Sequence, residues 1–515
     1  MMMKHLLKYT LPLVALLAVS CGGPENQTTD PVVEVPGPAL VSTNPADGTG
    51  GLTGSTLDII FTFDQKVTCT QQGQDAITVD GGAFKSGVSP SGGADLKVTV
   101  GGLSPGKSYT VTIPAGAVIG YKQNQKPSAA IQFHFSMKEP DPVEPGSWET
   151  AAEAVKNMGV GWNLGNTLES NSGDVNNMWI EASNTNYEYA WGQAPATREL
   201  FHLFKEAGFN AIRVPVTWYP HMGNFKSTVF STHWEKASWL ESTDYTVDPA
   251  WMARVKEVVG YVLDEGMYCI LNVHHDTGAA TTGWLKADKD VYDAVKARYC
   301  DLWRQIASAF EPYGPQLLFE SFNEMLNSAN QWNYASKEAD DVINAYNADF
   351  VATVRATGGN NANRNLVLNT YAASPDTRAL QDFQLPKDNA KDHLLAQVHS
   401  YAPYNFAFDT DWPQETFDAN CDREVRSIMD GLGNDLVARG IPCILGEYGA
   451  DTGKRAESEL AKQAACYVSQ AAKYNIACFY WMGLIDGKED RSAPRWTKTK
   501  LRDAILQAWR ENKND

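Results

Sequence analysis

The sequence predicts two folded parts, a small all-β sandwich followed by a large (β/α)8 barrel. The chain has 515 residues, which is too long for one ordinary domain. Residues 39–136 carry short alternating apolar runs separated by Gly, Pro and Asp turns, as in a sandwich. In residues 148–515, strand-like apolar stretches alternate with long amphipathic helical ones, which is typical of a barrel of parallel strands.

Composition and charge limit the class of protein. Hydrophobic residues make up 43 % of the chain and charged residues 20 %, as in soluble globular proteins. The formal net charge is −18, whereas a protein that binds nucleic acid needs clustered positive charge. We therefore expect no nucleic-acid partner. The 15 Trp and 21 Tyr belong to a core or to a groove for flat ligands.

The N-terminus has the pattern of a secretory signal over residues 1–20. Lys4 and Lys8 precede an apolar stretch that is too short to span a bilayer and that runs into Cys21. Ala18–Cys21 resembles a bacterial lipobox, in which the Cys is lipidated. This predicts an exported protein held at the bacterial outer membrane by a lipid on Cys21 alone, either at the cell surface or on the periplasmic face. Plain secretion with cleavage nearby is the alternative.

Two Pro-rich segments flank the predicted sandwich. Residues 21–38 are polar and lack periodicity, so we interpret them as a tether, and residues 137–147 as a stiff linker. The stretch "STNPADGTGGLTGSTLDIIFTFDQKV" resembles a bacterial immunoglobulin-like module, which we expect to act as a spacer. Gly102, Ser104 and Gly106 match a nucleophile-elbow pattern, but a strand and not a helix follows, which indicates a turn.

Eight strand-like stretches define the predicted barrel. Helical stretches separate them, and two have readable starts, Asp248 before Pro249 and Ser374 before Pro375. The strand-like stretches are "VGWNLGN", "NAIRVPVTW", "YCILNVHH", "LLFESFNE", "NLVLNTYA", "LLAQVHSY", "PCILGEYG" and "IACFYWMG".

Polar residues collect at the ends of these stretches. In a (β/α)8 barrel the carboxyl ends of the strands form one rim, and active sites lie there. We therefore expect the following side chains to converge: Asn163, Arg213, His274, His275, Asn323, Glu324, Tyr371, His399, Tyr401, Glu447 and Trp481.

Two of these residues are carboxylates on different strands, Glu324 and Glu447. Cleavage of a glycosidic bond needs such a pair, one acid to protonate the leaving oxygen and one carboxylate to attack or to activate water. Either residue alone could be a structural ion-pair partner, but the convergence favours catalysis. Glu320 lies four residues before Glu324, deeper in the barrel, where we expect a buried and paired structural acid.

The ordered motifs "IRVP", "NVHHD", "FNE", "VHSY", "ILGEYG" and "FYW" resemble glycoside hydrolase family 5 of the retaining clan A. The resemblance covers about residues 151–509. "GWNLGNTLE" and "VRATGGNNANRNL" are similar to its endoglucanase and xyloglucanase branch. It implies an endo-acting β-1,4-glucan hydrolase for cellulose, mixed-linkage glucan or xyloglucan, with Glu324 as general acid/base and Glu447 as nucleophile.

The neighbouring residues have expected roles in such a site. The charge of Glu447 would raise the pKa of Glu324 and keep it protonated. Arg213 would hold Glu447 ionised, unless it forms a generic barrel salt bridge. Tyr401 shares a strand face with His399 and would donate to the nucleophile, unless it is a core Tyr. The amide of Asn323 would bind the sugar 2-hydroxyl.

Asn163 is also expected to contact substrate, and His274 and His275 are expected to hydrogen-bond to substrate or to the region of the nucleophile. Because neighbouring strand residues point to opposite sides, the two His cannot share a metal ion with Asp276, and we expect no metal. Trp481 would form the floor of the subsite where cleavage occurs. The resemblance also implies a cis peptide after it, at Met482.

The stretch after the acid departs from the family, which usually has Pro where this chain has Met325. The loop of residues 326–336 is therefore expected to follow its own path, and specificity on the leaving-group side is open. Four Trp in or beside rim loops are candidate sugar platforms or packing residues: Trp218, Trp284, Trp332 and Trp412.

Eight Cys lie at positions 21, 69, 269, 300, 421, 443, 466 and 478, with no zinc-like spacing. Most are expected to be buried, although one or two disulfides are possible in an exported protein. "GVGWNLG" is not a dinucleotide fingerprint, so we expect no cofactor, and we expect a monomer. Two other functions stay open: the same mechanism on β-mannan or xylan, and a surface glycan-binding protein without activity.

Overall fold

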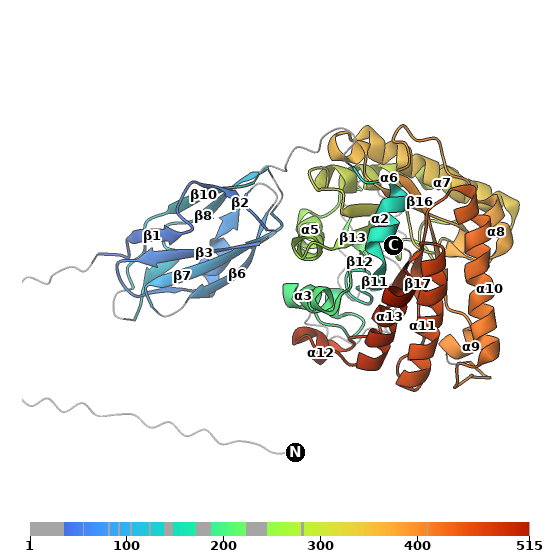
Figure 1. Ribbon diagram of the computed structural model, residues 1–515. Coiled ribbons are helices and arrows are strands. Elements are labelled where there is room, and N and C mark those ends of the chain that lie inside the picture. The colour runs from blue at the N-terminus through green and yellow to red at the C-terminus, as the bar shows by residue number, and fades with distance from the viewer. Residues whose placement is uncertain are drawn as a thin grey trace, which may run out of the picture.

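The computed structural model describes residues 36–54, 56–80, 83–90, 93–103, 106–122, 125–138, 148–170, 187–222, 245–279, 283–408 and 410–513. It contains a β-sandwich and a closed eight-stranded barrel, which confirms the predicted fold class (Figure 1). Within the described ranges, none of the helices is both long enough and apolar enough to cross a bilayer.

The sandwich packs two four-stranded sheets, ordered β1-β3-β7-β6 and β2-β10-β8-β5, beside a β4-β9 ribbon. Inward and outward side chains alternate along β3 and β10, as the sequence pattern requires. Phe61 and Phe133 meet edge to face at 5.6 Å between the sheets. The strands are β1 Leu40–Asn44, β2 Thr49–Leu52, β3 Thr56–Phe63, β4 Val67–Cys69, β5 Thr78–Val79, β6 Phe84–Pro90, β7 Asp95–Gly101, β8 Ser108–Ile113, β9 Val118–Gly120 and β10 Ile131–Met137, with α1 Gln71–Ala76 between β4 and β5.

The barrel strands follow one another around the ring in chain order, each parallel to its neighbours. All eight lie in the stretches that the sequence marks as strands. They are β11 Val160–Asn163, β12 Ala211–Val214, β13 Tyr268–Asn272, β14 Leu317–Glu320, β15 Leu366–Asn369, β16 Leu394–Ser400, β17 Cys443–Tyr448 and β18 Ala477–Trp481.

Helices surround the barrel (Figure 1). The start of α5 is as predicted, because Asp248 accepts from the Ala250 N–H and Pro249 is the first residue. The expected helix start at Ser374 is wrong: α8 begins at Thr377, where Asp376 accepts from Arg378 N–H, and Ser374 caps the turn before it. The helices are α2 Ala151–Met158, α3 Arg198–Ala207, α5 Pro249–Asp264, α6 Lys289–Ala309, α7 Lys337–Ala356, α8 Thr377–Asp382, α9 Tyr404–Ala407, α10 Ala419–Asp435, α11 Glu457–Lys473, α12 Lys488–Ser492 and α13 Thr499–Asn512.

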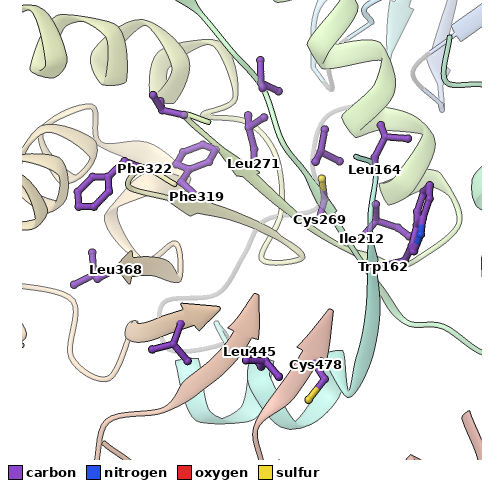
Figure 2. Packing of buried hydrophobic residues seen from close by; sticks show 14 of the residues in the cluster. Trp162, Leu164, Ile212, Cys269, Leu271, Phe319, Phe322, Leu368, Leu445 and Cys478 are labelled. Carbon is purple, nitrogen blue, oxygen red and sulfur yellow. The ribbon is translucent and has the colours of Figure 1, made fainter. Parts of the chain in front are cut away.

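The barrel strands have an apolar side toward the helices and a mixed side toward the barrel axis. Figure 2 shows part of the apolar side that faces the helices, where Trp162, Cys269 and Leu445 belong to one hydrophobic cluster. A separate inner cluster includes Ile270 and Leu318. Two residues farther along each of those strands the buried side chain is polar.

These side chains belong to a polar layer, which we define as six fully buried residues, one from each of β11 to β16. It lies directly beneath the carboxyl ends of the strands. The six residues are Asn163, Arg213, Asn272, Glu320, Asn369 and Gln397.

Seven Cys fall in the described part of the chain, and all are free thiols. Six are buried and Cys300 is partly buried, which confirms the prediction that most serve as small hydrophobic residues.

Candidate active site

Arg213 joins the polar layer to the mouth of the barrel. Its guanidinium donates to both oxygens of Glu320, at 2.6 and 2.7 Å, and to Glu447 Oε1 at 2.7 Å. It also donates to the side-chain oxygens of Asn163 and Asn323, at 2.9 and 2.8 Å. Every N–H of the fully buried guanidinium therefore has a partner, which fixes the position of both carboxylates.

Glu320 is a buried, paired acid, as its depth in the strand suggests. Burial opposes its ionisation, but the charge and hydrogen bonds of Arg213, with a hydrogen bond from Asn272, hold the pKa of Glu320 below its ordinary value. The Arg213–Glu320 pair is therefore a fixed ion pair beneath the site.

Asn163 was expected to contact substrate, and this expectation is wrong. Its side chain is fully buried, donates to Gly446 O at 2.9 Å and accepts from Arg213. Because Asn163 belongs to β11 and lies in the polar layer, it orients Arg213 and has no access to a ligand. Arg213 is likewise inaccessible, so it acts on Glu447 and not on substrate directly.

Glu324 and Glu447 face each other across the mouth, with His399 between them. One oxygen of each carboxylate and one His399 nitrogen all lie within 4.8 Å of one another. His399 Nδ1 is 2.8 Å from Glu324 Oε1 and 3.6 Å from Glu447 Oε2. Tyr401 donates to Glu447 Oε2 at 2.6 Å. The side chains of Glu324 and Glu447 are 21 % and 5 % exposed, so Glu324 is the more accessible to a ligand.

A register shift positions Glu447. Leu445 pairs with Val398 but Glu447 pairs with His399, so Gly446 is an extra residue in β17. The shift re-aims Glu447 toward the barrel axis. A Cβ at Gly446 would lie only 2.3 Å from Gln397 Oε1, which explains the glycine.

The two carboxyls titrate differently. Burial raises the pKa of Glu324 to about 7; the charge of Arg213 lowers it, and that of Glu320 raises it. The expected main cause, the charge of Glu447, is therefore replaced by burial and the deeper Glu320. Burial also raises the pKa of Glu447, against His399, Arg213 and the Tyr401 hydrogen bond, which favour its ionised form. Because Arg213 and Tyr401 contact Glu447 directly, Glu447 is the carboxyl that is ionised, and Glu324 is the one that keeps its proton.

His274 and His275 are neighbours in space, contrary to the expected opposite orientations. Their ring centroids are 4.6 Å apart because both residues follow the end of β13 at Asn272, where strand alternation no longer applies. His274 stacks on Trp481 at 5.8 Å, and His275 meets Trp191 edge to face at 5.1 Å. Burial lowers the pKa of both His, which are neutral at pH 7.

Asn323 lies beside Glu324 at the mouth and is 4 % exposed. Its side-chain oxygen accepts from Arg213, which leaves the amide N–H2 as the group that can donate to a ligand. The ion-paired Arg213 therefore fixes the amide orientation.

Trp481 is partly exposed at the end of β18. The expected cis peptide after it is wrong: in the described ranges, cis bonds occur at Asn44–Pro45 and Ala402–Pro403. Met482 instead has φ +46°, and its carbonyl accepts from Trp162 Nε1 at 2.9 Å.

The four candidate Trp platforms divide into two pairs. Trp218 and Trp284 are buried and donate to Asn272 O and Asp276 Oδ1, at 2.9 and 2.6 Å, so they are packing residues. Trp332 and Trp412 are 50 % and 83 % exposed.

A cavity of about 580 Å³ opens beside Glu324, and Trp332 is part of its wall. Tyr404 and Phe408, from α9 and the residue after it, line the same cavity and are exposed. The aromatic cluster in "YAPYNFAF" is the sequence signal that could have identified them.

The loop after Met325 is tied to β15. Tyr371, expected on the rim, is fully buried; its hydroxyl accepts from Asn327 N–H at 3.1 Å and donates to Gln331 O at 2.7 Å. Tyr371 therefore supports the loop that carries Trp332.

Glu324, His399 and Glu447 are also the group of ligand atoms in the described ranges that could surround a metal ion. His399 Nδ1 is hydrogen-bonded to Glu324, and Tyr401 and Arg213 donate to Glu447, so protein groups hold this arrangement. Cys21, the predicted lipidation site, lies outside the described residues, as do Ser104 and residues 21–35 of the predicted tether.

A barrel whose mouth holds two opposed carboxylates, one protonated and one held by Arg, belongs to the class of the glycoside hydrolases. The chain is a member of the Cellulase family (glycosyl hydrolase family 5), which matches residues 172–485. The Bacterial Ig-like domain family matches residues 34–137.

Relatives agree with this assignment. Endoglucanase A of Ruminococcus albus is 34 % identical over 370 residues, which are 70 % of this chain and 92 % of the relative. A family 5 enzyme from Prevotella bryantii B14, solved with a xyloglucan tetradecasaccharide, is 39 % identical with a TM-score of 0.61 and covers 70 % of this chain and 99 % of its own. A broad specificity endoglucanase from Ruminococcus champanellensis with bound cellotriose is 36 % identical, with a TM-score of 0.60, covering 70 % and 98 %.

Proposed function

We propose that the protein is an endo-acting β-1,4-glucan hydrolase that retains anomeric configuration, with Glu447 as nucleophile and Glu324 as general acid/base. The observation that carries the proposal is the placement of one oxygen of each carboxylate within 4.8 Å of the other and of His399. A retaining site needs carboxyl groups about 5–5.5 Å apart, whereas an inverting site leaves room for a water between them.

In the first step, Glu447 attacks the anomeric carbon and the glycosidic C–O bond breaks. Glu324 gives its proton to the departing oxygen, so the shortened chain leaves with a free hydroxyl. Arg213 and Tyr401 hold Glu447 in its attacking geometry by the hydrogen bonds described above. The Asn323 amide N–H2 donates to the sugar 2-hydroxyl, a contact that strengthens in the transition state.

In the second step, a water attacks the anomeric carbon of the glycosyl–enzyme, and the bond to Glu447 breaks. Glu324, now ionised, takes a proton from that water. Esterification of Glu447 removes the repulsion between the two charged carboxylates, so the ionised form of Glu324 no longer faces a second negative charge. Two inversions give net retention.

The cavity beside Glu324 is the proposed place of the leaving-group half of the substrate. It lies on the proton-donating side, and Trp332 and Tyr404 offer exposed flat rings there. The bound xyloglucan and cellotriose of two similar enzymes support a β-glucan as substrate class here. We include xyloglucan and mixed-linkage glucan among the substrates.

The test is product analysis on xyloglucan, mixed-linkage glucan, cellulose, β-mannan and xylan in parallel. We expect oligosaccharides of internal cleavage from the glucans, with the newly formed reducing end first appearing as the β-anomer in NMR spectra. Glu324→Gln is the control for contaminating activity. Product release from mannan or xylan alone would overturn the proposed substrate class. Initial formation of the α-anomer would overturn the retaining mechanism. Binding of glucans without product release would overturn the enzymatic function.

We also propose that the chain is exported as a monomer and anchored by a lipid on Cys21, with the immunoglobulin-like module as a spacer. The motif around Cys21 supports this proposal. Detergent phase partition tests it: the wild-type chain should enter the detergent phase and Cys21→Ser the aqueous phase. Equal partition of both into the aqueous phase would refute the anchor.

A further inference from the structure

The polar layer contains a buried amide that the proposed reaction does not use. Gln397 belongs to β16, is fully buried, and lies two residues before His399. Residues two apart on a strand point to the same side, so the Gln397 amide lies directly beneath the His399 ring. Its Nε2 is 3.3 Å from His399 Nε2.

The neighbours of Gln397 determine which way its amide points. Asn369 donates its Nδ2 to the Phe322 carbonyl, so Asn369 presents its oxygen to Gln397. Gln397 Nε2 donates to that oxygen at 3.0 Å. The amide nitrogen, and not the oxygen, therefore faces His399.

The other end of the Gln397 amide supports this orientation. Within the described residues, Gln397 Oε1 has no hydrogen-bond partner, and it occupies the space that the missing Cβ of Gly446 leaves. A buried polar atom without a partner is unfavourable, so packing alone would favour an apolar side chain here. The useful part of Gln397 is its N–H2 group.

We propose that Gln397 is a positioning residue that sets the tautomer of His399, so that His399 always presents an Nδ1–H to Glu324. Gln397 donates to His399 Nε2, which must therefore be an unprotonated acceptor, and the ring proton resides on Nδ1. This inference rests on the proposed function for its catalytic consequence, but not for the tautomer itself.

The consequence concerns the proton of the acid. Nδ1–H donates to Glu324 Oε1 at 2.8 Å, so the proton of Glu324 resides on its other oxygen. In the second step the same donor stabilises the ionised Glu324. With the opposite tautomer, an Nδ1 lone pair would face Glu324 and compete with the leaving group for its proton.

A second His of the site has the same arrangement, in which a buried amide two residues earlier donates to one ring nitrogen. Asn272 lies two residues before His274, and its amide orientation is fixed because Oδ1 accepts from Val216 N–H at 3.1 Å. Asn272 Nδ2 faces His274 Nδ1 at 3.0 Å, which makes that nitrogen the acceptor and places the proton on Nε2. The motifs "NVH" and "QVH" thus assign opposite tautomers to two neutral His of one site.

The charged and titratable groups around His399 come from several strands of the barrel. They are Glu320 and Glu324 from β14 and the residues that follow it, Arg213 from β12, His274 after β13, Tyr401 after β16, and Glu447 from β17. Burial lowers the pKa of His399 to about 4, so the ring is neutral near pH 7 and its tautomer matters.

The first test reads the tautomer without substrate. Two-bond ¹H–¹⁵N correlation spectra of the ¹⁵N-labelled protein separate Nδ1–H from Nε2–H rings, and His399→Gln identifies the signal. We expect Nδ1–H for His399 in the wild type and a tautomer mixture in Gln397→Met. A wild-type Nε2–H ring, or an unchanged ring in Gln397→Met, would overturn the proposal.

The second test measures the pH dependence of activity, which reports the pKa of Glu324. Because donation to Glu324 favours its ionised form, Gln397→Met should move the alkaline limb of kcat/KM upward by about 0.5–1 pH unit. Gln397→Met should also lower kcat about tenfold for substrates with poor leaving groups, while KM changes little. For a dinitrophenyl glycoside, whose leaving group needs no acid, kcat/KM should change little. In Gln397→Glu, a carboxylate accepts from Nε2–H, so the ring should become Nε2–H and the limb should move the same way.

Gln463→Met is the matched control. Gln463 is also fully buried, and its Oε1 has no partner among the residues that the structure describes. Its amide donates to two backbone carbonyls, Ala402 O and Gly449 O. Its loss should lower stability without moving the alkaline limb; an equal shift in both variants would refute a specific role. An inactive wild type with an Nδ1–H ring would overturn the proposed function and leave the tautomer assignment intact.

Discussion

The polar layer and the mouth above it each hold a Glu side chain, and the two environments shift its pKa in opposite directions. Glu320 and Glu324 lie four residues apart in "FESFNE". Glu320 is fully buried and accepts from Nε and Nη2 of Arg213, and its pKa is lowered. Glu324 is 21 % exposed beside a neutral His, and burial raises its pKa to about 7.

The difference shows that burial alone does not decide the protonation of an acid. A cation in direct contact offsets burial for Glu320 and makes it a permanent anion. Without such contact, Glu324 holds a proton at neutral pH. Two Glu residues only four positions apart thus have different roles, because Glu320 lies in the polar layer against Arg213 and Glu324 lies at the mouth.

The largest expected effect comes from removing the protonated acid of the mouth. Glu324→Gln should lower kcat/KM on polysaccharide by about 10³–10⁴, because general acid catalysis is lost. With a dinitrophenyl glycoside the first step needs no acid and should be far less affected. Steady-state kinetics with both substrates, and calorimetric binding of oligosaccharide, test this. Equal loss on both substrates would show that Glu324 is not the acid.

Breaking the polar layer should affect both folding and activity. Arg213→Met leaves the carboxylates of Glu320 and Glu447 without their cation and should lower the free energy of unfolding by about 3–5 kcal/mol. Urea unfolding measures it. Arg355→Met, which breaks the buried pair with Asp388 remote from the mouth, is the control: it should lower stability but keep activity per folded molecule. Full activity in folded Arg213→Met would contradict the account.

The pH dependence separates the two acids. The first step needs Glu324 protonated, so kcat/KM should fall as pH rises through about 7, the pKa to which burial raises this carboxyl. The fall at low pH reports protonation of Glu447. Glu320 stays ionised throughout and contributes no limb. The alkaline limb should vanish in Glu324→Gln assayed with a dinitrophenyl glycoside; its persistence there would assign it to another group.

The smallest expected effect is at the cavity wall. Trp332→Ala should raise KM for long glucans about 2–10-fold, since aromatic contacts contribute about 0.5–1.5 kcal/mol. Trp412 is more exposed but does not line the cavity, so Trp412→Ala should change KM less than about twofold. Initial rates on graded oligosaccharides decide, and a larger effect at Trp412 would relocate the leaving-group side.

The sequence predicts most of this fold because the strands repeat a strong signal. Each stretch such as "YCILNVHH" joins a short apolar run to a polar end, and parallel strands bring those ends together. The convergence of Glu324, Glu447, His399 and Tyr401 at the mouth follows from that pattern, whereas the aim of Glu447 also depends on the extra residue Gly446 in β17. The sandwich strands are similarly evident from alternation in "TLDIIFTF".

The sequence could not predict which polar side chains lie below the mouth. Asn163 is the last residue of β11 and is fully buried, whereas Asn323 lies past the end of β14 at Glu320 and reaches the mouth. Both residues stand near the end of a strand-like stretch, and the sequence does not show where the strand itself stops. His274 and His275 lie past the last strand residue, where alternation fails. The amide orientation of Gln397 depends on Asn369 and Gly446, both distant along the chain.

Trapping the glycosyl–enzyme tests the central claim most directly. A 2-deoxy-2-fluoro cellobioside with a dinitrophenolate leaving group should form a stable covalent adduct, and mass spectrometry of the digested protein should place it on Glu447. Glu447→Gln should remain unlabelled. A label on any other residue, or no label together with products of inverted configuration, would contradict the assignment of Glu447 and Glu324.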